Sequence, residues 1–265
     1  MTRAFLSAVL LLILTARHPV GTTAPVRAPL RVLTYNIHHG EGTDGQFDLH
    51  RLGAVIASVA PDLVALQEVD EGTERSGGIH QATELGRLTG LHATFGKAID
   101  FQGGAYGVGV LSREPVLRME NHPLPGTADR EPRTALTVDV PLGNDGEVLQ
   151  FTSTHLDQGR GMGNRMAQAG FINQLLARRS NMAGILAGDM NSRADAEVMQ
   201  VFGERWTDVF VEPAPIEQTG RRFRIDHVLA RPASRWRTVE SRIMDEPVAS
   251  DHRPVLVVLE PVDAP

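Results

Sequence analysis

Carboxylates and amides that could do chemistry recur where short apolar runs of this chain end. Asn36, Glu68 and Asp189 each close such a run, and Asn191 lies two positions after the last of them. A buried polar group costs free energy unless it has partners, so we expect these side chains to meet at one rim of a sheet, where strand ends lie together. Asp189 and Asn191 would point the same way if the backbone between them is extended. Carboxylate and amide oxygens are ligands that a hard divalent cation prefers.

Histidines and further carboxylates occupy similar positions. His155 closes an apolar run, Asp226 with His227 is assigned to the end of another, and Asp251-His252 stands before the last one. An imidazole titrates near neutral pH, and a carboxylate beside it can hold its orientation and raise its basicity. His227 alternates away from Asp226 along a strand, so we expect it to be structural. Acids, amides and imidazoles together can orient water and hold a phosphate.

The composition restricts which chemistry is open to the chain. Its 265 residues are 42% hydrophobic and 22% charged, which is enough for one sizeable core. The net charge of −6 does not indicate a broad basic face, although it only weakly disfavours nucleic acid. The chain has no cysteine, so disulfides, thiolate catalysis and cysteine-bound zinc are excluded. A metal site must use carboxylates, amides and histidines, which suits Mg²⁺ or Mn²⁺.

The N-terminus is typical of an export signal. Arg3 precedes an almost wholly apolar stretch over residues 4–16, which is short for a membrane span, and small residues follow. We therefore predict a signal peptide over residues 1–24, a linker over 25–29 and one domain over 30–262. The expected location is the periplasm or the exterior, with an uncleaved membrane anchor as the alternative.

The remaining pattern alternates short apolar runs with amphipathic or glycine-rich stretches. Runs rich in Val, Ile, Leu and Thr predict strands at Arg31–Ile37, Leu63–Glu68, Gly107–Ser112, Thr134–Val140, Val148–His155, Gly184–Asp189, Arg224–Leu229 and Pro254–Leu259. Helical spacing predicts helices at Leu49–Ala60, Gln81–Thr89, Arg165–Ala177 and Ala194–Phe202. The fourth and fifth strands should form a hairpin around residues 143–146. Strands outnumber helices, which indicates large sheets covered by helices in layers.

The order of the polar motifs is similar to that of a known protein family, although no single motif would be specific for it. Eight of them follow one another, each attached to a strand-like run: Leu33–Ile37, Leu66–Asp70, Tyr106–Arg113, Pro132–Leu136, Ser153–Asp157, Ala187–Asn191, Arg224–Val228 and Ser250–Pro254. This series resembles the endonuclease/exonuclease/phosphatase superfamily over about residues 30–259. The resemblance implies an α/β fold of the DNase I-like kind, a four-layer sandwich of two packed mixed β-sheets flanked by helices.

The resemblance also implies a role for each matching residue. Glu68 would bind Mg²⁺ or Mn²⁺, with Asn36 and Asp251 completing the metal shell. The remaining assignments cover catalysis and phosphate binding: His155, Asp189, Asn191, Asp226 and His252 as catalytic residues, and Tyr106, Arg133, Asn191 and His155 as phosphate contacts. Arg130 is an alternative to Arg133. We prefer Arg133 because it stands at the start of an apolar run. Whether Asp189 or His252 is the general base stays open.

Departures from the family pattern bear on the substrate. The stretch Gly107–Gly109 has no carboxylate where pancreatic-type nucleases carry a Glu, and His38 stands where abasic-site enzymes have an Asp. The segment Val69–Gly78 is more similar to exported or membrane-associated bacterial hydrolases, including the sphingomyelinase-like branch. The main prediction is therefore a metal-dependent phosphodiesterase or phosphomonoesterase that acts as a monomer on a phospholipid, nucleic acid or small phosphodiester, with no obligate protein partner.

Two rival functions stay open at this point. One is a metal-dependent nuclease acting on DNA or RNA, and the other is a binding module that kept the fold and lost turnover. A zinc esterase is poorly supported, because the chain has no His-Glu-x-x-His spacing.

Overall fold

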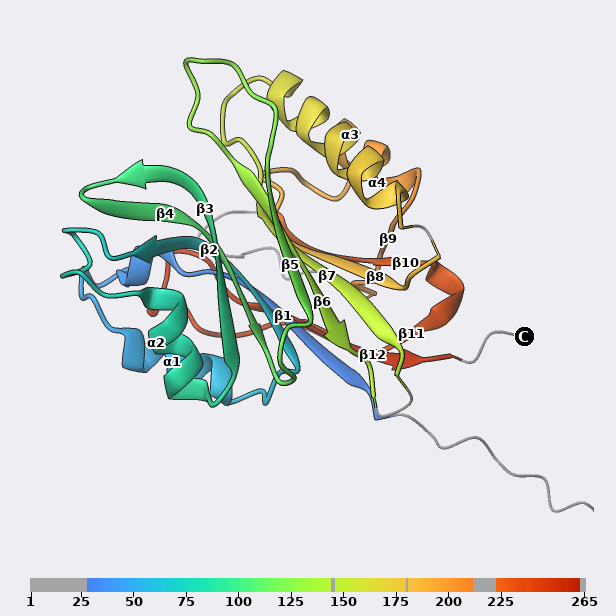
Figure 1. Ribbon diagram of the computed structural model, residues 1–265, viewed down its shortest axis with the longest axis horizontal. Helices are drawn as coiled ribbons and strands as arrows, with labels where there is room; N and C mark the ends of the chain where they lie inside the picture. Colours follow the sequence, from blue (N-terminus) through green and yellow to red (C-terminus); the bar gives the residue numbers. More distant parts are fainter. Residues whose placement is uncertain (1–27, 144–145, 180, 212–222, 263–265) are drawn as a thin grey trace, which may run out of the picture.

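The protein folds into four layers, with two β-sheets packed face to face and a pair of helices on each outer side (Figure 1). The computed structural model describes residues 28–143, 146–179, 181–211 and 223–262. The predicted four-layer sandwich is confirmed. The predicted signal peptide and most of the linker lie outside the described residues. Within the described ranges, no helix has the length and apolar character needed to cross a membrane.

The first sheet has a parallel pair of strands at its centre. Its strand order is β11 (Trp236–Ile243), β12 (Val255–Pro261), β1 (Leu30–Asn36), β2 (Leu63–Glu71), β4 (Gly104–Ser112) and β3 (His92–Phe101). Strands β1 and β2 run parallel, and every other neighbouring pair is antiparallel. The parallel pair is possible because α1 (Leu49–Ala57) makes the crossover between its two strands.

The second sheet repeats the same pattern of strand directions. Its order is β5 (Arg118–Pro123), β6 (Thr134–Pro141), β7 (Val148–His155), β8 (Gly184–Asp189), β10 (Asp226–Arg231) and β9 (Thr207–Asp208). Strands β7 and β8 are the parallel pair, joined through α3 (Gly163–Ala177). Strands β6 and β7 form the predicted hairpin. Each sheet therefore has two strand ends at its centre that face the same rim.

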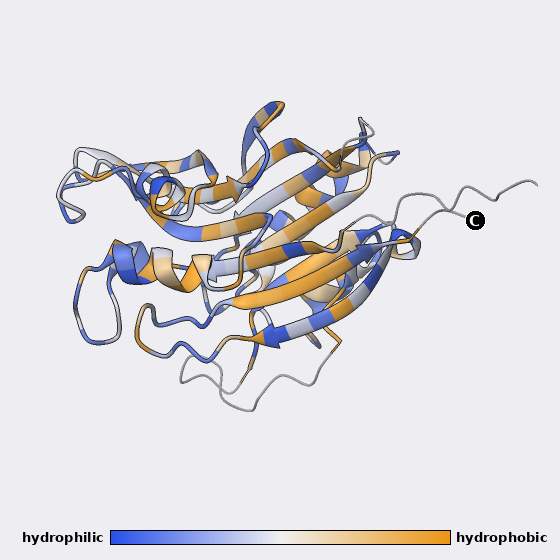
Figure 2. Cartoon of the chain, turned by 90° about the horizontal axis from the view of Figure 1, so that it is seen from below, coloured by the Kyte–Doolittle hydropathy of each residue, from blue (hydrophilic) through white to orange (hydrophobic). Residues whose placement is uncertain are grey.

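Three apolar cores hold the layers together. The central core lies between the sheets and includes Val110 and Phe151. A second core packs α1 (Leu49–Ala57) and α2 (Gln81–Thr89) on the first sheet. A third packs α3 (Gly163–Ala177) and α4 (Glu197–Gly203) on the second. Hydrophobic residues run along the strands in the middle of the molecule, while many of the loops are hydrophilic (Figure 2).

The predicted elements are present, three of them with the predicted ends and the others with shifted ends, and four strands were missed. Helix α1 ends at Ala57 rather than at the predicted Ala60. The backbone of Ala60, just before Pro61, is left-handed with φ of 42°. Helix α4 begins at Glu197 rather than Ala194. The missed strands are β3, β5, β9 and β11, which all lie at sheet edges. Their side chains are mostly exposed or half-buried, so they lack the apolar run that marks a central strand.

Candidate active site

The candidate site lies at one rim of the sandwich, where ends and beginnings of strands meet. Asn36, His155 and Asp189 are the last residues of β1, β7 and β8. Asp226 was assigned to a strand end, and that prediction is wrong because it is the first residue of β10. It still reaches the rim, because β10 runs antiparallel to β8 and pairs Asp226 with Asp189.

Strand direction also explains why residues before or near the start of other strands reach the rim. Arg133 precedes β6, which is antiparallel to β7. His252 precedes β12, which is antiparallel to β1, and Tyr106 lies near the start of β4, which is antiparallel to β2. The Ser250 hydroxyl donates to the Asn36 carbonyl oxygen at 2.7 Å and thereby ties the loop before β12 to the end of β1.

A cavity of about 330 Å³ opens at this rim. Eight of the ten predicted site residues line it: Glu68, Tyr106, Arg133, His155, Asp189, Asn191, Asp251 and His252. The other two, Asn36 and Asp226, are buried and hydrogen-bonded to lining residues. The rim therefore brings together side chains that are separated by more than two hundred positions in the sequence.

Glu68 reaches the cavity through a β-bulge. The predicted strand was to end at Glu68, but β2 continues to Glu71 and the register with β4 shifts between Gln67 and Val69. Glu68 is the extra residue and has a left-handed backbone with φ of 58°. Bulges beside active sites redirect a side chain out of the alternating pattern of a strand, and this one directs Glu68 into the cavity.

Asn36 links two carboxylates. Its Nδ2 donates to Glu68 Oε1 at 2.9 Å and to Asp189 Oδ2 at 3.3 Å, and its Oδ1 accepts from the backbone N–H of His38 at 3.1 Å. The predicted role as a metal ligand would need the amide oxygen to face Glu68. In this structure the amide nitrogen faces Glu68, so ligation by Asn36 stays a prediction.

His252 and Asp226 form a buried, hydrogen-bonded pair. His252 Nδ1 lies 2.9 Å from Asp226 Oδ2, and both side chains are almost fully buried. Burial by itself lowers the pKa of His252, but the Asp226 carboxylate outweighs it, and the pKa is raised to about 10. The imidazole therefore carries a positive charge at neutral pH. Its Nε2 points toward Asp189, with 3.7 Å between Nε2 and Oδ2.

Asp189 stands at the centre of the group. Burial raises the pKa of its carboxyl, and the neighbouring Asp226 charge adds to the rise. Its Oδ1 accepts from the backbone N–H of Asn191 at 2.8 Å, which closes a turn. The expectation that an extended backbone aligns Asp189 with Asn191 is wrong, because Asn191 is left-handed with φ of 46°. Both side chains nevertheless line the cavity.

Close packing of β7 against β8 brings His155 beside Asp189. A Cβ at Gly188 would lie 1.9 Å from the Thr154 carbonyl oxygen, so only glycine fits there. His155 Nε2 lies 3.5 Å from Asp189 Oδ2. Arg133 Nη1 lies 3.1 Å from His155 Nδ1, and a guanidinium can only donate. His155 Nδ1 therefore accepts from Arg133, while Nε2 faces both Asp189 Oδ2 and the Asn191 amide nitrogen, the latter at 3.1 Å.

The choice of Arg133 over Arg130 agrees with the geometry. Arg133 is 4% exposed, lines the cavity and also pairs with Glu131 at 2.8 Å. Arg130 Nε lies 3.8 Å from Asp157 Oδ1 in the loop after β7. His227 is directed away from the cavity as expected, with Nδ1 2.8 Å from Asp208 Oδ2.

An aromatic and cationic wall was only partly predicted. Tyr106 is buried, which raises the pKa of its hydroxyl, and Glu68 adds to that rise. The Arg75 guanidinium lies 4.7 Å from the Phe101 ring centroid and 5.5 Å from that of Tyr106. Arg75 is held by the buried Asp70 carboxylate through contacts of 2.7 and 2.8 Å. Sequence reasoning missed Arg75 because it lies in a loop without a strand-like run.

His38 and His39 were also not predicted as site residues. They form the short 3-10 turn η1 (His38–Gly40) directly after β1, and both line the cavity. Burial lowers the pKa of His39, and the charge of Arg75 adds to the effect. The adjacent histidines were visible in the sequence, but nothing there showed that the turn folds back over Glu68.

The oxygen ligands at the rim fit a divalent cation. Glu68 and Asp251 line the same cavity, and among the described residues Asp251 Oδ1 is buried without a hydrogen-bond partner. A buried carboxylate oxygen of this kind needs a proton donor or a cation. Glu68 and Asp251 are therefore the residues that would hold Mg²⁺ or Mn²⁺, both of which favour oxygen ligands.

Comparisons with known proteins agree with this architecture. The model of the Endonuclease/Exonuclease/phosphatase family matches residues 33–252. The crystal structure of an endonuclease/exonuclease/phosphatase from Beutenbergia cavernae superposes with a TM-score of 0.77 at 26% identity, covering 90% of this chain and 73% of that one. The chain therefore belongs to the Endonuclease/Exonuclease/phosphatase family.

Two further solved structures share the fold at lower identity. A mannosyl-6-phosphatase from Bacteroides thetaiotaomicron has a TM-score of 0.69 at 19% identity, covering 87% of this chain and 99% of its own. The human Nocturnin catalytic domain, solved with bound sulfate, has a TM-score of 0.70 at 18% identity, covering 89% and 96%. The predicted family is confirmed, and with it the coarse class of hydrolase.

Proposed function

We propose that this chain is an exported phosphoesterase that requires Mg²⁺ or Mn²⁺ and hydrolyses a small phosphodiester or phosphomonoester by in-line attack of water. The observation that carries the proposal is the convergence of Glu68, Asp189 and the His252–Asp226 pair on one cavity. The N-terminal pattern supports export, and the oxygen ligands at the rim support the choice of metal ion.

The position of each side chain indicates its chemical role. Asp189 is the best-placed base for the attacking water, because its Oδ2 lies between His155 and His252. The charged His252 faces the same space and stabilises negative charge that develops on the phosphoryl group. Asp226 holds the His252 ring in place from behind. A divalent ion on Glu68 and Asp251 would supply Lewis acidity toward a phosphoryl oxygen.

Three further side chains that line the cavity can bind the phosphate. Arg133 and Tyr106 are donors, and Asn191 adds an amide. His155 is oriented by Arg133 and can donate from Nε2 to a phosphate oxygen or to the leaving oxygen. These donors are pre-placed by buried strands, so they need little reorganisation when charge develops.

The size and lining of the cavity favour a small phosphoester. A volume of about 330 Å³ accommodates a compact ligand or head group. Ile99 and Phe101 give its mouth an apolar side, which suits the uncharged part of a phospholipid head group or a sugar ring. A sphingomyelinase-like activity is one member of this substrate class. We expect a monomer, because every proposed site residue comes from a single chain.

The test is hydrolysis of bis-p-nitrophenyl phosphate and p-nitrophenyl phosphate by the purified protein. We expect turnover that EDTA abolishes and that Mg²⁺ or Mn²⁺ restores. Glu68→Gln and His252→Ala should each lower the rate at least about 100-fold while the circular dichroism spectrum is unchanged. Glu74→Gln is the matched control, because Glu74 is exposed and does not line the cavity. Full activity in both site variants would overturn the assignment.

A substrate panel then separates the proposed function from its rivals. Sphingomyelin and phosphatidylcholine vesicles, sugar phosphates, inositol phosphates and plasmid DNA would be assayed with each metal ion. Faster cleavage of the plasmid, weakened by salt, would favour the nuclease reading. Metal binding without turnover of any ester would favour a binding module.

A further inference from the structure

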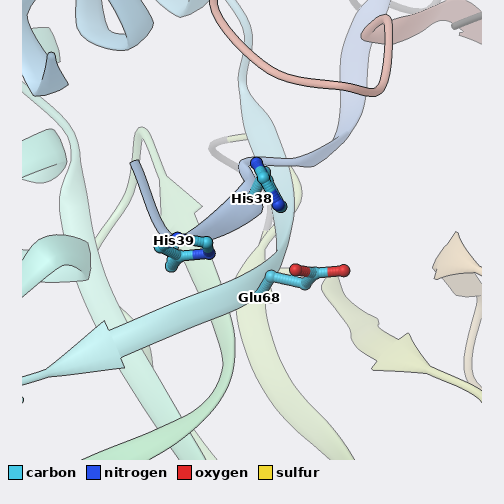
Figure 3. Close-up of side chains that lie close together, drawn as sticks. All are labelled: His38, His39 and Glu68. Carbon is cyan, nitrogen blue, oxygen red and sulfur yellow. The ribbon is translucent and has the colours of Figure 1, made fainter. Parts of the chain in front are cut away.

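Two imidazoles and one carboxylate meet at the edge of the cavity (Figure 3). His38 and His39 belong to the turn η1 after β1, and Glu68 is the bulge residue of β2. One potential ligand atom from each lies within 4.8 Å of the other two. All three side chains line the cavity and are half-buried. A ligand bound between them would therefore be open to solvent and substrate on one side.

The backbone of all three residues is held in an unfavourable conformation. Their φ angles are 44° at His38, 44° at His39 and 58° at Glu68, although none is glycine. Each such residue costs on the order of 1–3 kcal/mol and persists only where surrounding contacts impose it. Non-glycine residues with this backbone cluster at active sites and ligand clamps.

The contacts that impose this geometry come from Gln81 and Asn36. Gln81 Nε2 donates to the His39 carbonyl oxygen at 2.6 Å, and Gln81 Oε1 accepts from the Asp70 N–H at 2.8 Å. One buried side chain therefore fastens the histidine turn to the strand that bears Glu68. Asn36 Oδ1 accepts from the His38 N–H and its Nδ2 holds Glu68 Oε1, which fastens the same two segments a second time.

Each imidazole keeps one ring nitrogen available as a ligand. His38 Nδ1 lies 3.0 Å from the Glu41 carbonyl oxygen, which can only accept, so Nδ1 carries the proton and Nε2 keeps its lone pair. His39 Nε2 lies 3.4 Å from the Glu41 carboxylate, which leaves Nδ1 of the neutral ring as its lone-pair nitrogen. Metal-binding histidines are oriented in this way, with the second ring nitrogen donating to a carbonyl or a carboxylate.

We propose that His38, His39 and Glu68 bind a divalent metal ion of the nitrogen-seeking kind, such as Zn²⁺ or Co²⁺, in preference to Mg²⁺. Imidazole favours these ions, while Mg²⁺ favours oxygen ligands and retained water. Three protein ligands leave at least one open position, which faces the cavity. The inference rests on the proposed function, because this site shares Glu68 with the proposed Mg²⁺ or Mn²⁺ site, and an ion bound to the imidazoles would compete with the hydrolytic metal ion for that carboxylate.

The ligand atoms need only a small movement to close on an ion. Ligands about 2.1 Å from a tetrahedral ion lie about 3.4 Å apart. The present spread of up to 4.8 Å must therefore contract by about 1.4 Å. Rotation of the half-buried side chains can supply that movement without changing the turn.

The test is direct binding of Co²⁺ to the metal-free full-length protein, followed by its visible d–d absorption. We expect saturation at one equivalent, displacement by stoichiometric Zn²⁺, and displacement by Mg²⁺ only at about 100-fold excess or more. A double His38→Asn, His39→Asn variant should weaken Co²⁺ binding at least about 100-fold. Replacing a residue that only orients a metal ligand already lowers metal affinity about 10–100-fold. Asparagine is chosen because it tolerates the left-handed backbone.

His92→Asn is the matched control, because His92 is exposed and does not line the cavity. It should leave Co²⁺ affinity within about 2-fold. A second measurement needs no substitution: bound Co²⁺ should selectively broaden the His38 and His39 imidazole signals in the NMR spectrum of the unaltered protein.

The outcomes separate this inference from the proposed function. Equal Co²⁺ affinity in the double variant, or an absence of broadening at His38 and His39, would overturn the inference even if Mg²⁺-dependent hydrolysis is seen. Imidazole-dependent Co²⁺ binding without hydrolysis of any ester would support the inference and count against the proposed function.

Discussion

At the scale of single residues, the site depends on charges that are buried in pairs. His252 and Asp226 are both almost fully buried, and neither charge would be tolerated there alone. The hydrogen bond between them keeps Nε2 of His252 directed into the cavity beside Asp189. The ring can therefore stay charged at neutral pH in a place where burial alone would remove its proton.

This pair makes a prediction about pH. In metal-free protein, NMR should show His252 titrating far above the ordinary value of 6.5, at about 10. In Asp226→Asn the pKa should fall well below about 10, because burial still lowers it and the largest raising influence is gone, while Asp189 and Asp251 still raise it. An unchanged His252 titration in the variant would contradict the assignment.

The same pair should contribute to stability in a defined pH window. The folded state binds the His252 proton more tightly than the unfolded state does, so the contribution is complete below pH 6.5 and is lost as the pH rises through about 10. Urea unfolding of the parent and Asp226→Asn at several pH values should show the largest difference at the acidic end of this window.

At the scale of elements, the direction of each strand decides which residues reach the rim. The parallel strands β1, β2, β7 and β8 place residues at or near their C-terminal ends on the rim. Their antiparallel partners place residues at or near their beginnings on the same rim. The separation between β7 and β8 at Gly188 and the register of this pair are part of this arrangement, because the register sets His155 beside Asp189.

Gly188→Ala tests that separation. The added methyl group would overlap the Thr154 carbonyl oxygen, so the strands must move apart. We expect a loss of about 1–3 kcal/mol or more in the free energy of unfolding, and a fall in activity, measured by urea denaturation and ester hydrolysis.

The control is Gly170→Ala in α3, where an added methyl group meets no atom within 4 Å. It should stabilise the protein by about 0.5–1 kcal/mol, because alanine is the better helix former. Equal effects of the two substitutions would contradict the close approach of β7 and β8.

At the scale of the whole molecule, the two sheets are joined by one continuous apolar core. Residues from both sheets contact one another there, so the two halves of the rim cannot separate without exposing it. Glu68 comes from the first sheet and Asp189 from the second. The geometry of the candidate site is thus a property of the sheet–sheet interface.

Phe151→Ala should weaken both sheets together. Phe151 is fully buried in the central core, so its truncation should cost about 3–5 kcal/mol and leave a single unfolding transition. Circular dichroism and tryptophan fluorescence should report the same midpoint. Phe171→Ala, at a position that is 36% exposed on α3, should cost much less. Two separate transitions would indicate that the sheets unfold independently.

The sequence by itself determined the family, the central strands and the four helices, and it predicted ten site residues. It could do so because buried strands leave apolar runs, and because Asn36, Glu68, Asp189 and His252 follow or precede those runs in a recognisable order. The edge strands β3, β5, β9 and β11 have no such runs, since most of their side chains are exposed or half-buried and β9 has only two residues.

Only the tertiary structure decided how those residues meet. The bulge and left-handed backbone at Glu68, the position of Asp226 at the start of β10, and the return of His38 and His39 over Glu68 depend on pairing between strands distant in sequence. Local residue patterns predict whether a side chain is buried. They do not predict which neighbour it packs against, because that neighbour is determined by strand direction and register.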